Sequence, residues 1–76
     1  MIKEHYRVIL TVPVKEHSLQ PGDIGAVVYI HNEGEAFEVE FVTLDGQTTA
    51  VLELESNQIW PVGEREIPHA RPLPAA

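Results

Sequence analysis

The chain has 76 residues, a formal net charge of −7 and no cysteine. Its length suits one small domain, and the missing cysteines exclude a disulfide framework and a thiolate zinc site. No apolar run approaches the roughly 20 residues of a membrane-spanning helix, and the first residues lack the basic-then-apolar order of a signal peptide. We therefore expect a soluble, cytoplasmic protein that does not bind membranes.

Acidic residues are concentrated in the middle of the chain, where residues 23–62 contain no Lys or Arg. The eight acids of this segment are Asp23, Glu33, Glu35, Glu38, Glu40, Asp45, Glu53 and Glu55. A surface of this sign repels phosphate backbones, so we expect no nucleic-acid binding by this part of the chain. It suits a basic protein partner. The alternative is that the charge only keeps a small protein soluble.

The first predicted strand spans residues 6–12, where apolar and more polar side chains alternate. Its inward side chains are Val8, Leu10 and Val12, and Ile9 interrupts the polar alternation on the other face. Pro13 ends this strand or keeps it at a sheet edge. Leu19 is expected to return to the core just before a turn at Pro21-Gly22, a pair that suits turn dihedrals.

The second predicted strand spans residues 23–31. Gly25 lies within it, where glycine is typical of a bulge, a sharp bend or a close backbone approach. Strict alternation would place Val28 and Ile30 in the core and direct Val27, Tyr29 and His31 to the opposite face. This places an aromatic side chain on the outer surface.

Two hairpins are predicted to follow. Residues 32–35 form the first, with Gly34 in the left-handed conformation, and residues 36–42 form a third strand. Its inward side chains are Phe37, Val39 and Phe41, and its outward ones are Glu38 and Glu40. Asp45-Gly46 suits a type I′ turn. Residues 48–54 are the fourth strand, with Ala50, Leu52 and Leu54 inward and Val51 and Glu53 outward.

A single helical turn capped by Ser56 and Asn57 and a short closing strand at residues 59–62 complete the domain. Five short strands with no helix-period segment predict an all-β fold, and we expect a small five-stranded SH3-like barrel over residues 1–62. A five-stranded Greek-key barrel of the oligonucleotide-binding type is the alternative. It usually has a helix between strands three and four, for which residues 43–47 leave no room.

Residues 63–76 have a different character, with three prolines in the last nine residues. Such a composition favours an extended, polyproline-type tail without internal hydrogen bonds. Ile67 and Leu73 are the apolar side chains with which it could contact the domain. Whether this tail is ordered without a partner is left open by the sequence.

Three segments together resemble a small bacterial family, the domain of unknown function 4926. They are residues 19–28, which contain Pro-Gly-Asp-Ile-Gly, residues 34–46, which contain Glu-Val-Glu-Phe, and residues 51–54. The resemblance covers roughly residues 7–62. It implies a small β-barrel without recorded enzymatic activity, and it implies the smaller partner of a two-gene unit, in the manner of an antitoxin beside its toxin.

The sequence offers no constellation of catalytic or metal-binding residues. The four histidines, at positions 5, 17, 31 and 69, lack the His-Glu-x-x-His spacing, and no serine lies in a Gly-x-Ser-x-Gly motif. Glu38 and Glu40 could form a carboxylate pair of the kind that hydrolyses glycosides, but a small barrel offers no deep cleft to raise one pKa. We expect no enzyme, no cofactor and no metal site.

Exposed side chains therefore remain as the candidate functional residues. We predict a partner-binding surface formed by Tyr29, His31, Glu38, Glu40, Glu53 and Trp60, because aromatic anchors carry much of the energy of protein interfaces. For Trp60 the alternative is packing against the end of the barrel. The expected function is an acidic, non-enzymatic module that docks a basic protein, which the resemblance implies to be toxin-like. The alternative is a self-associating accessory subunit with its tail on a neighbouring copy.

Overall fold

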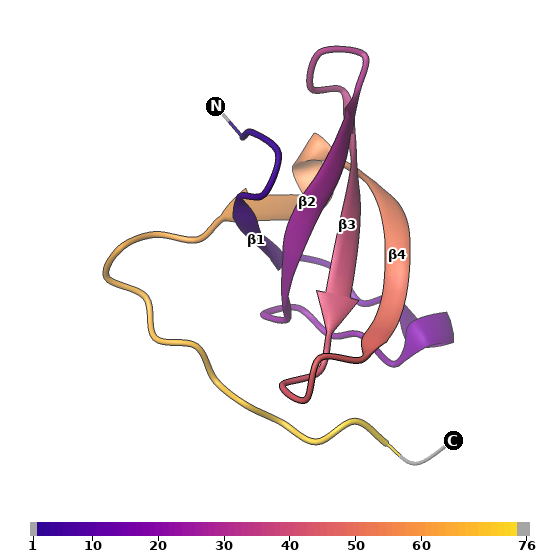
Figure 1. Ribbon diagram of the computed structural model, residues 1–76, viewed down its shortest axis with the longest axis vertical. Helices are drawn as coiled ribbons and strands as arrows, with labels where there is room; N and C mark the ends of the chain where they lie inside the picture. The colour runs from indigo at the N-terminus through magenta and orange to yellow at the C-terminus, as the bar shows by residue number, and fades with distance from the viewer. Residues whose placement is uncertain (1, 75–76) are drawn as a thin grey trace.

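The computed structural model describes residues 2–74, and within them five strands form one antiparallel sheet (Figure 1). The strands are β1 (Arg7–Leu10), β2 (Ile24–His31), β3 (Ala36–Val42), β4 (Thr48–Glu55) and β5 (Ile59–Pro61). Two single-turn 3₁₀ helices, η1 (Lys15–His17) and η2 (Ser56–Gln58), lie between strands. The all-β prediction is confirmed, and no α-helix occurs in the described part of the chain.

The sheet is open, so the expectation of a closed barrel is wrong. Its strand order is β4-β3-β2-β1-β5, and β4 and β5 form its two edges without pairing to each other. All three residues of β5 pair with β1, and η2 separates β5 from β4 by a single turn. The last strand therefore pairs with β1, at the edge of the sheet away from β4. No pairing within residues 2–74 joins β4 to β5 and closes the sheet.

The hydrophobic core lies on the concave side of the curved sheet, where side chains of all five strands converge. Its buried members are Val8, Leu10, Leu19, Val27, Phe37, Val39, Phe41, Ala50, Leu54 and Ile59. The alternation predicted for β3 and β4 is confirmed, and so is the return of Leu19 to the core. Val12 and Leu52 are partly buried beside this cluster.

Gly25 lies where β2 packs closely against side chains of β3. A Cβ at this position would lie 2.5 Å from Cγ1 of Val39 and 3.0 Å from Cε1 of Phe41. Only glycine leaves room for these two side chains, which confirms the predicted close approach. The backbone there can curl β2 over the core while it still pairs with β1 through Val8.

A β-bulge in β2 overturns the predicted position of Val28. The register with β3 shifts between Val27, which pairs with Val39, and Tyr29, which pairs with Glu38. Val27 is consequently the buried residue, whereas Val28 is 39% exposed. The bulge inserts one residue and restarts the alternation, so Tyr29 still faces outward and Ile30 still packs against the core.

The two hairpin turns differ in how well they match the prediction. Gly34 has φ of 107°, as expected for the left-handed residue of the first turn. In the second turn the N–H of Gly46 donates to the carbonyl of Thr43, and φ is positive at Gly46 but not at Asp45. A type I′ turn needs positive φ at both central residues. The turn is therefore of type I, followed by a glycine bulge.

Element boundaries and caps also depart from the prediction at two places. The first strand is shorter than residues 6–12, because the chain leaves the β1–β2 ladder after Leu10. At η2 the cap is not supplied by Ser56 or Asn57. Instead Oε1 of Gln58 accepts a hydrogen bond of 2.7 Å from the N–H of Glu55. A longer amide side chain thus reaches back to satisfy the free N–H.

Residues 63–74 contain no strand or helix and run around the outside of the sheet (Figure 1). Arg71 fixes this tail to the domain. Its Nε donates to Oδ1 of Asp23 at 2.9 Å, and its Nη2 donates to Oδ2 of Asp23 at 2.5 Å and to the carbonyl of Ser18 at 2.7 Å. The polyproline conformation of the tail and the division of the chain at residue 62 stay predictions.

No helix within residues 2–74 is long and apolar enough to cross a bilayer.

Candidate protein-binding surface

Four of the six predicted binding residues meet on the outer face of β2, β3 and β4. Tyr29 and His31 contact each other edge to face, with ring centroids 4.8 Å apart. Nε2 of His31 lies 2.8 Å from Oε2 of Glu38 and 4.0 Å from Oε1 of Glu53. Glu38 and Glu53 are direct cross-strand partners. The bulge in β2 brings Tyr29 opposite Glu38 and so assembles this group.

His31 supports one side of an exposed aromatic ring through an edge contact. Nε2 of His31 and Oε2 of Glu38 are 2.8 Å apart, within hydrogen-bond distance, and a carboxylate can accept such a bond from a ring N–H. The held imidazole then supports one side of Tyr29, whose residue surface is 51% exposed. A ring that is restrained before binding loses little conformational entropy when a partner covers it.

Glu40 extends the same face toward the other end of β3. It pairs with Ala26 on β2 and with Val51 on β4, and its Oε2 accepts a 2.6 Å hydrogen bond from the hydroxyl of Thr48. Val51 is half exposed beside it. We call the surface formed by Tyr29, His31, Glu38, Glu40 and Glu53 the docking face.

Trp60 is not part of the docking face. It lies on β5, at the opposite edge of the sheet from β4, and pairs with Ile9 of β1. Its residue surface is 65% exposed, so the alternative of packing against the domain end is wrong. Ile59, its neighbour in the strand, is the residue that enters the core.

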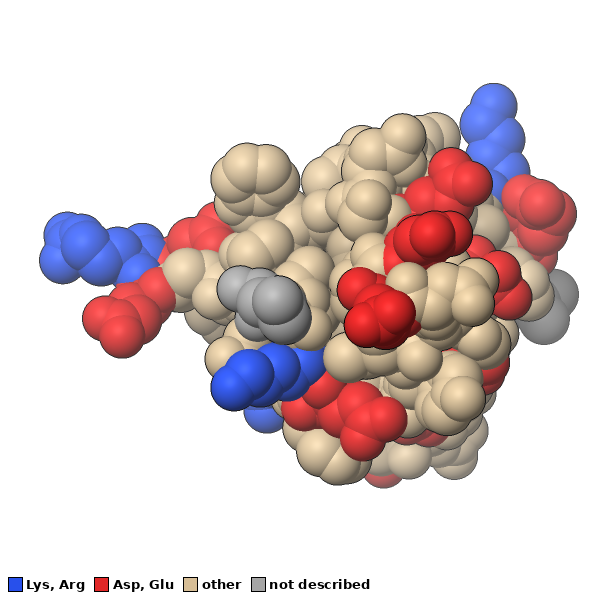
Figure 2. Space-filling view, turned by 90° about the horizontal axis from the view of Figure 1, so that it is seen from above, with Lys and Arg blue, Asp and Glu red and all other residues tan. Residues whose placement is uncertain are grey.

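The charge of the surface is strongly one-sided around the docking face. In Figure 2 most acidic side chains lie over the right half of the view, and cationic side chains lie at the far left, at the upper right and below the centre. The first hairpin adds Glu33 and Glu35 to the acids of β3 and β4. Apart from His31, no side chain that can carry positive charge interrupts residues 23–62. The electrostatic field of such a surface attracts and orients a basic partner.

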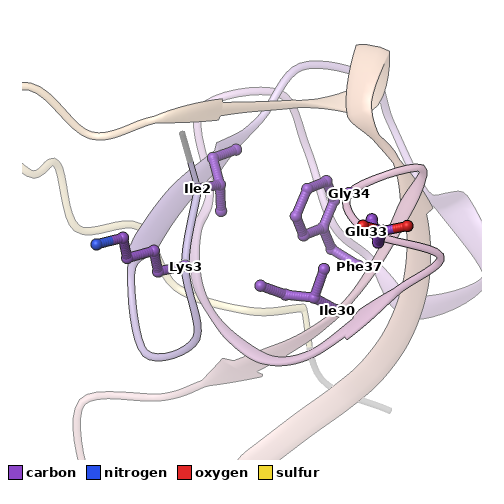
Figure 3. Close-up of a pocket in the computed structure, with 6 residues that line it drawn as sticks. All are labelled: Ile2, Lys3, Ile30, Glu33, Gly34 and Phe37. Carbon is purple, nitrogen blue, oxygen red and sulfur yellow. The ribbon is translucent and has the colours of Figure 1, made fainter.

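A half-open apolar hollow of about 500 Å³ lies beneath the first hairpin. Ile2, Ile30 and Phe37 converge in it, while Lys3 points outward and Glu33 lies at the hairpin (Figure 3). No hydroxyl or imidazole lines this hollow. It can accept an apolar side chain, and Lys3 and Glu33 are its two charged lining residues.

The ion pair of the tail perturbs the protonation of Asp23. Burial raises the pKa of this carboxyl, but the hydrogen bonds from Arg71 and from the N–H of Gln20, with the charge of Arg71, outweigh burial and hold the pKa below its ordinary value. The hydrogen bond to Asp23 likewise raises the pKa of Arg71. Sequence reasoning missed this contact, because the partners are 48 residues apart and no local pattern links them.

Metal ligands and paired carboxylates are the other chemical groups that the sequence brings into question. Within residues 2–74 no three His, Asp or Glu side chains are grouped in a way that could hold a metal ion. Glu38 and Glu40 both lie on the open outer face and use their oxygens for His31 and Thr48. The docking face thus presents an exposed aromatic ring beside carboxylates on an open surface.

A family model described as "Domain of unknown function (DUF4926)" matches residues 4–61. The chain belongs to this family. The match includes all five strands and the whole docking face, and it ends before the tail begins. No curated protein and no solved structure is detectably similar to the chain.

Proposed function

We propose that this chain is a non-enzymatic binding module that docks a basic partner protein through the docking face. The observation that carries the proposal is the half-exposed ring of Tyr29, held by His31 and bordered by Glu38 and Glu53. An aromatic anchor surrounded by charges of one sign combines a source of affinity with a source of specificity.

The two parts of the docking face would contribute differently. The glutamates accelerate encounter with a basic protein and select it over acidic ones, an effect that salt weakens. The ring of Tyr29 loses water on contact and slows dissociation. Where the partner is a toxin-like protein, as the family resemblance implies, covering its basic surface would neutralise it in an antitoxin-like manner. The cytoplasm, whose reducing conditions suit a chain without cysteine, is the proposed compartment.

The fold is compatible with a protein whose sheet presents an exposed face to a partner. The strand order β4-β3-β2-β1-β5 and the 3₁₀ turn before β5 are the features that favour an SH3-like arrangement, here left open. Such small sheets serve many unrelated functions, so the proposal depends on the docking face and not on the fold.

A binding experiment with matched variants tests the proposal. The wild-type chain and the variants Tyr29→Ala and Leu44→Ala are each immobilised on a resin. Native extract is passed over each resin, and the retained proteins are eluted with salt. We expect one stoichiometric basic protein on the wild type and on Leu44→Ala, whose changed side chain is 97% exposed in the second turn and is not one of the docking-face residues. Its retention on Tyr29→Ala should fall strongly. Equal retention on all three would contradict the proposal.

Self-association is the second candidate function, and the exposed Trp60 favours it. A large aromatic side chain on an edge strand is a common element of interfaces between identical subunits. Ile67 in the tail is 90% exposed and could cover a neighbouring copy. Measurement of the mass in solution distinguishes this candidate: a dimer that Trp60→Ala converts to a monomer supports it, and a monomeric wild type excludes it.

A further inference from the structure

We propose that the free edge of β4 binds an extended peptide segment of the partner, which adds to the sheet as a sixth antiparallel or parallel strand and carries Lys or Arg at alternate positions. This inference rests on the proposed function and specifies how the basic partner would be held. The main support for it is the set of free backbone N–H and C=O groups of β4, to which the acidic side chains add.

The edge of β4 has unused hydrogen-bonding capacity. β4 pairs with β3 on one side and forms the end of the sheet on the other. Alternate residues of an edge strand direct their N–H and C=O groups away from the sheet. Among residues 48–54, no backbone group bonds to any described segment other than β3. These groups are thus free to pair with another strand.

The two edges of the sheet are not equally protected. β5 has only three residues and ends in Pro61, which has no N–H to donate. β4 has eight residues and contains no Pro, Gly or Lys, the residues that commonly block edge pairing. Its register with β3 is regular from Ala50 to Glu55. β4 therefore presents a regularly paired run, from Ala50 to Glu55, along which an added strand could pair.

Side chains on both faces of β4 would contact an added strand. Leu52 points toward the core but stays only partly buried at the open edge, so an apolar side chain of the incoming segment could cover it. On the outer face, Val51 is half exposed and Glu53 lies beside Glu38. A cation placed next to Glu53 would form a favourable cross-strand pair.

Charge selects a foreign segment over a second copy of this chain. A second β4 would bring its own Glu53 and Glu55 against the same residues, and like charges on neighbouring strands oppose pairing. The tail is also unsuited, because its prolines interrupt a ladder. An extended segment with alternating apolar and cationic side chains satisfies both the free backbone and the acidic outer face, which is the mode of strand addition.

The test uses the whole chain, labelled with ¹⁵N, and the peptide Ac-Thr-Lys-Val-Arg-Val-Lys-Thr-NH₂ as a probe. A control peptide of the same sequence is N-methylated at two consecutive backbone amides, so one edge-facing donor is lost in either register. Chemical shifts and amide exchange are measured residue by residue. We expect the probe to slow exchange at alternate residues of β4 roughly tenfold and the methylated peptide to bind roughly tenfold more weakly.

Two protein variants with the same change of charge complete the design. Glu53→Lys should weaken probe binding roughly tenfold by turning one attraction into a repulsion, whereas Glu64→Lys, in the exposed tail, should change it little. If both peptides bind equally and shift only Tyr29 and Glu38, the inference is wrong and the proposed function stands. If neither peptide binds at low salt, both the inference and the proposed function fail.

Discussion

Gly25 and Val39 approach so closely that a side chain on the glycine would overlap the valine, with 2.5 Å between the added Cβ and Cγ1 of Val39. Val39 is fully buried at the centre of β3 and cannot move without disturbing Phe41 and its other core neighbours. The absence of a side chain at Gly25 thus allows β2 to pack closely against β3, the central strand of the docking face.

Gly25→Ala should therefore destabilise the domain by about 1–3 kcal/mol, the usual cost of overpacking a core. For a chain of this length we expect the Tm to fall by roughly 5–20 °C. Gly63→Ala is the matched control, because a Cβ there meets only the movable side chain of Glu66 at 3.3 Å. Thermal unfolding followed by circular dichroism measures both. Equal Tm values for the two variants would refute the close-packing argument.

The same substitution, Leu to Ala, should cost much more stability in the core than in the second turn. Leu10→Ala removes a fully buried side chain and should cost about 2–5 kcal/mol of the free energy of unfolding, which is a large part of the stability of so small a domain. Leu44→Ala changes an exposed turn residue and should stay within about 0.5 kcal/mol. Urea unfolding curves give both values. A marked loss in Leu44→Ala would mean that this turn is covered.

Arg71 should determine whether the tail stays on the domain. Arg71→Ala removes the three hydrogen bonds to Asp23 and Ser18, so residues 63–74 should gain mobility on the nanosecond timescale while the sheet stays folded. Arg65→Ala is the control, since Arg65 is exposed in the same tail. ¹⁵N relaxation reports the mobility. An unchanged order parameter in the tail of Arg71→Ala would contradict the anchoring role.

Acid should release the same contact. The pKa of Asp23 is lower in the folded chain than its ordinary value of 3.8, so the carboxylate stabilises the fold above that value. This contribution is lost as the pH falls through the lowered pKa. We expect the tail to become mobile in this acidic range in the wild type, and Arg71→Ala to lose that pH dependence. A tail that stays rigid in the wild type after Asp23 is protonated would argue against the ion pair as the anchor.

His31 should act on binding by positioning Tyr29. His31→Ala leaves the aromatic ring present but removes its edge contact and the bridge to Glu38. Both residues lie on the outer face, so stability should change by no more than about 0.5 kcal/mol, while the affinity for the basic partner falls. His17→Ala, in η1 and exposed, is the control. Equal affinities for the two variants would show that the ring needs no support.

The sequence predicted best those parts of the fold that depend on local pattern. Phe37, Val39 and Phe41 alternate with two glutamates, so the inward face of β3 follows directly from the period of a strand. Gly25 stood out because glycine is unusual inside a strand. In the Val27–Val28 pair, by contrast, both neighbours are apolar and equally suited to the core. Nothing local shows which one the bulge directs outward.

Features that depend on distant parts of the chain were not predictable in the same way. Closure of the sheet depends on where β4 and β5 lie relative to each other, and no residue encodes that relation locally. The contact of Arg71 with Asp23 is likewise non-local. The docking face was identified in part because Tyr29, His31 and Glu38 could be assigned to outer faces, whereas the separation of Trp60 from them required the strand order.

The most direct test of the account is the affinity of the basic partner for the wild-type chain and for Tyr29→Ala, measured by calorimetry at low and high salt. The account predicts that salt weakens binding to the wild type, and that Tyr29→Ala loses about 2 kcal/mol or more of binding free energy at both salt concentrations. Trp60→Ala should bind as the wild type does. Binding that is indifferent to salt and to Tyr29 but lost in Trp60→Ala would contradict the account and place the interface on the opposite edge of the sheet.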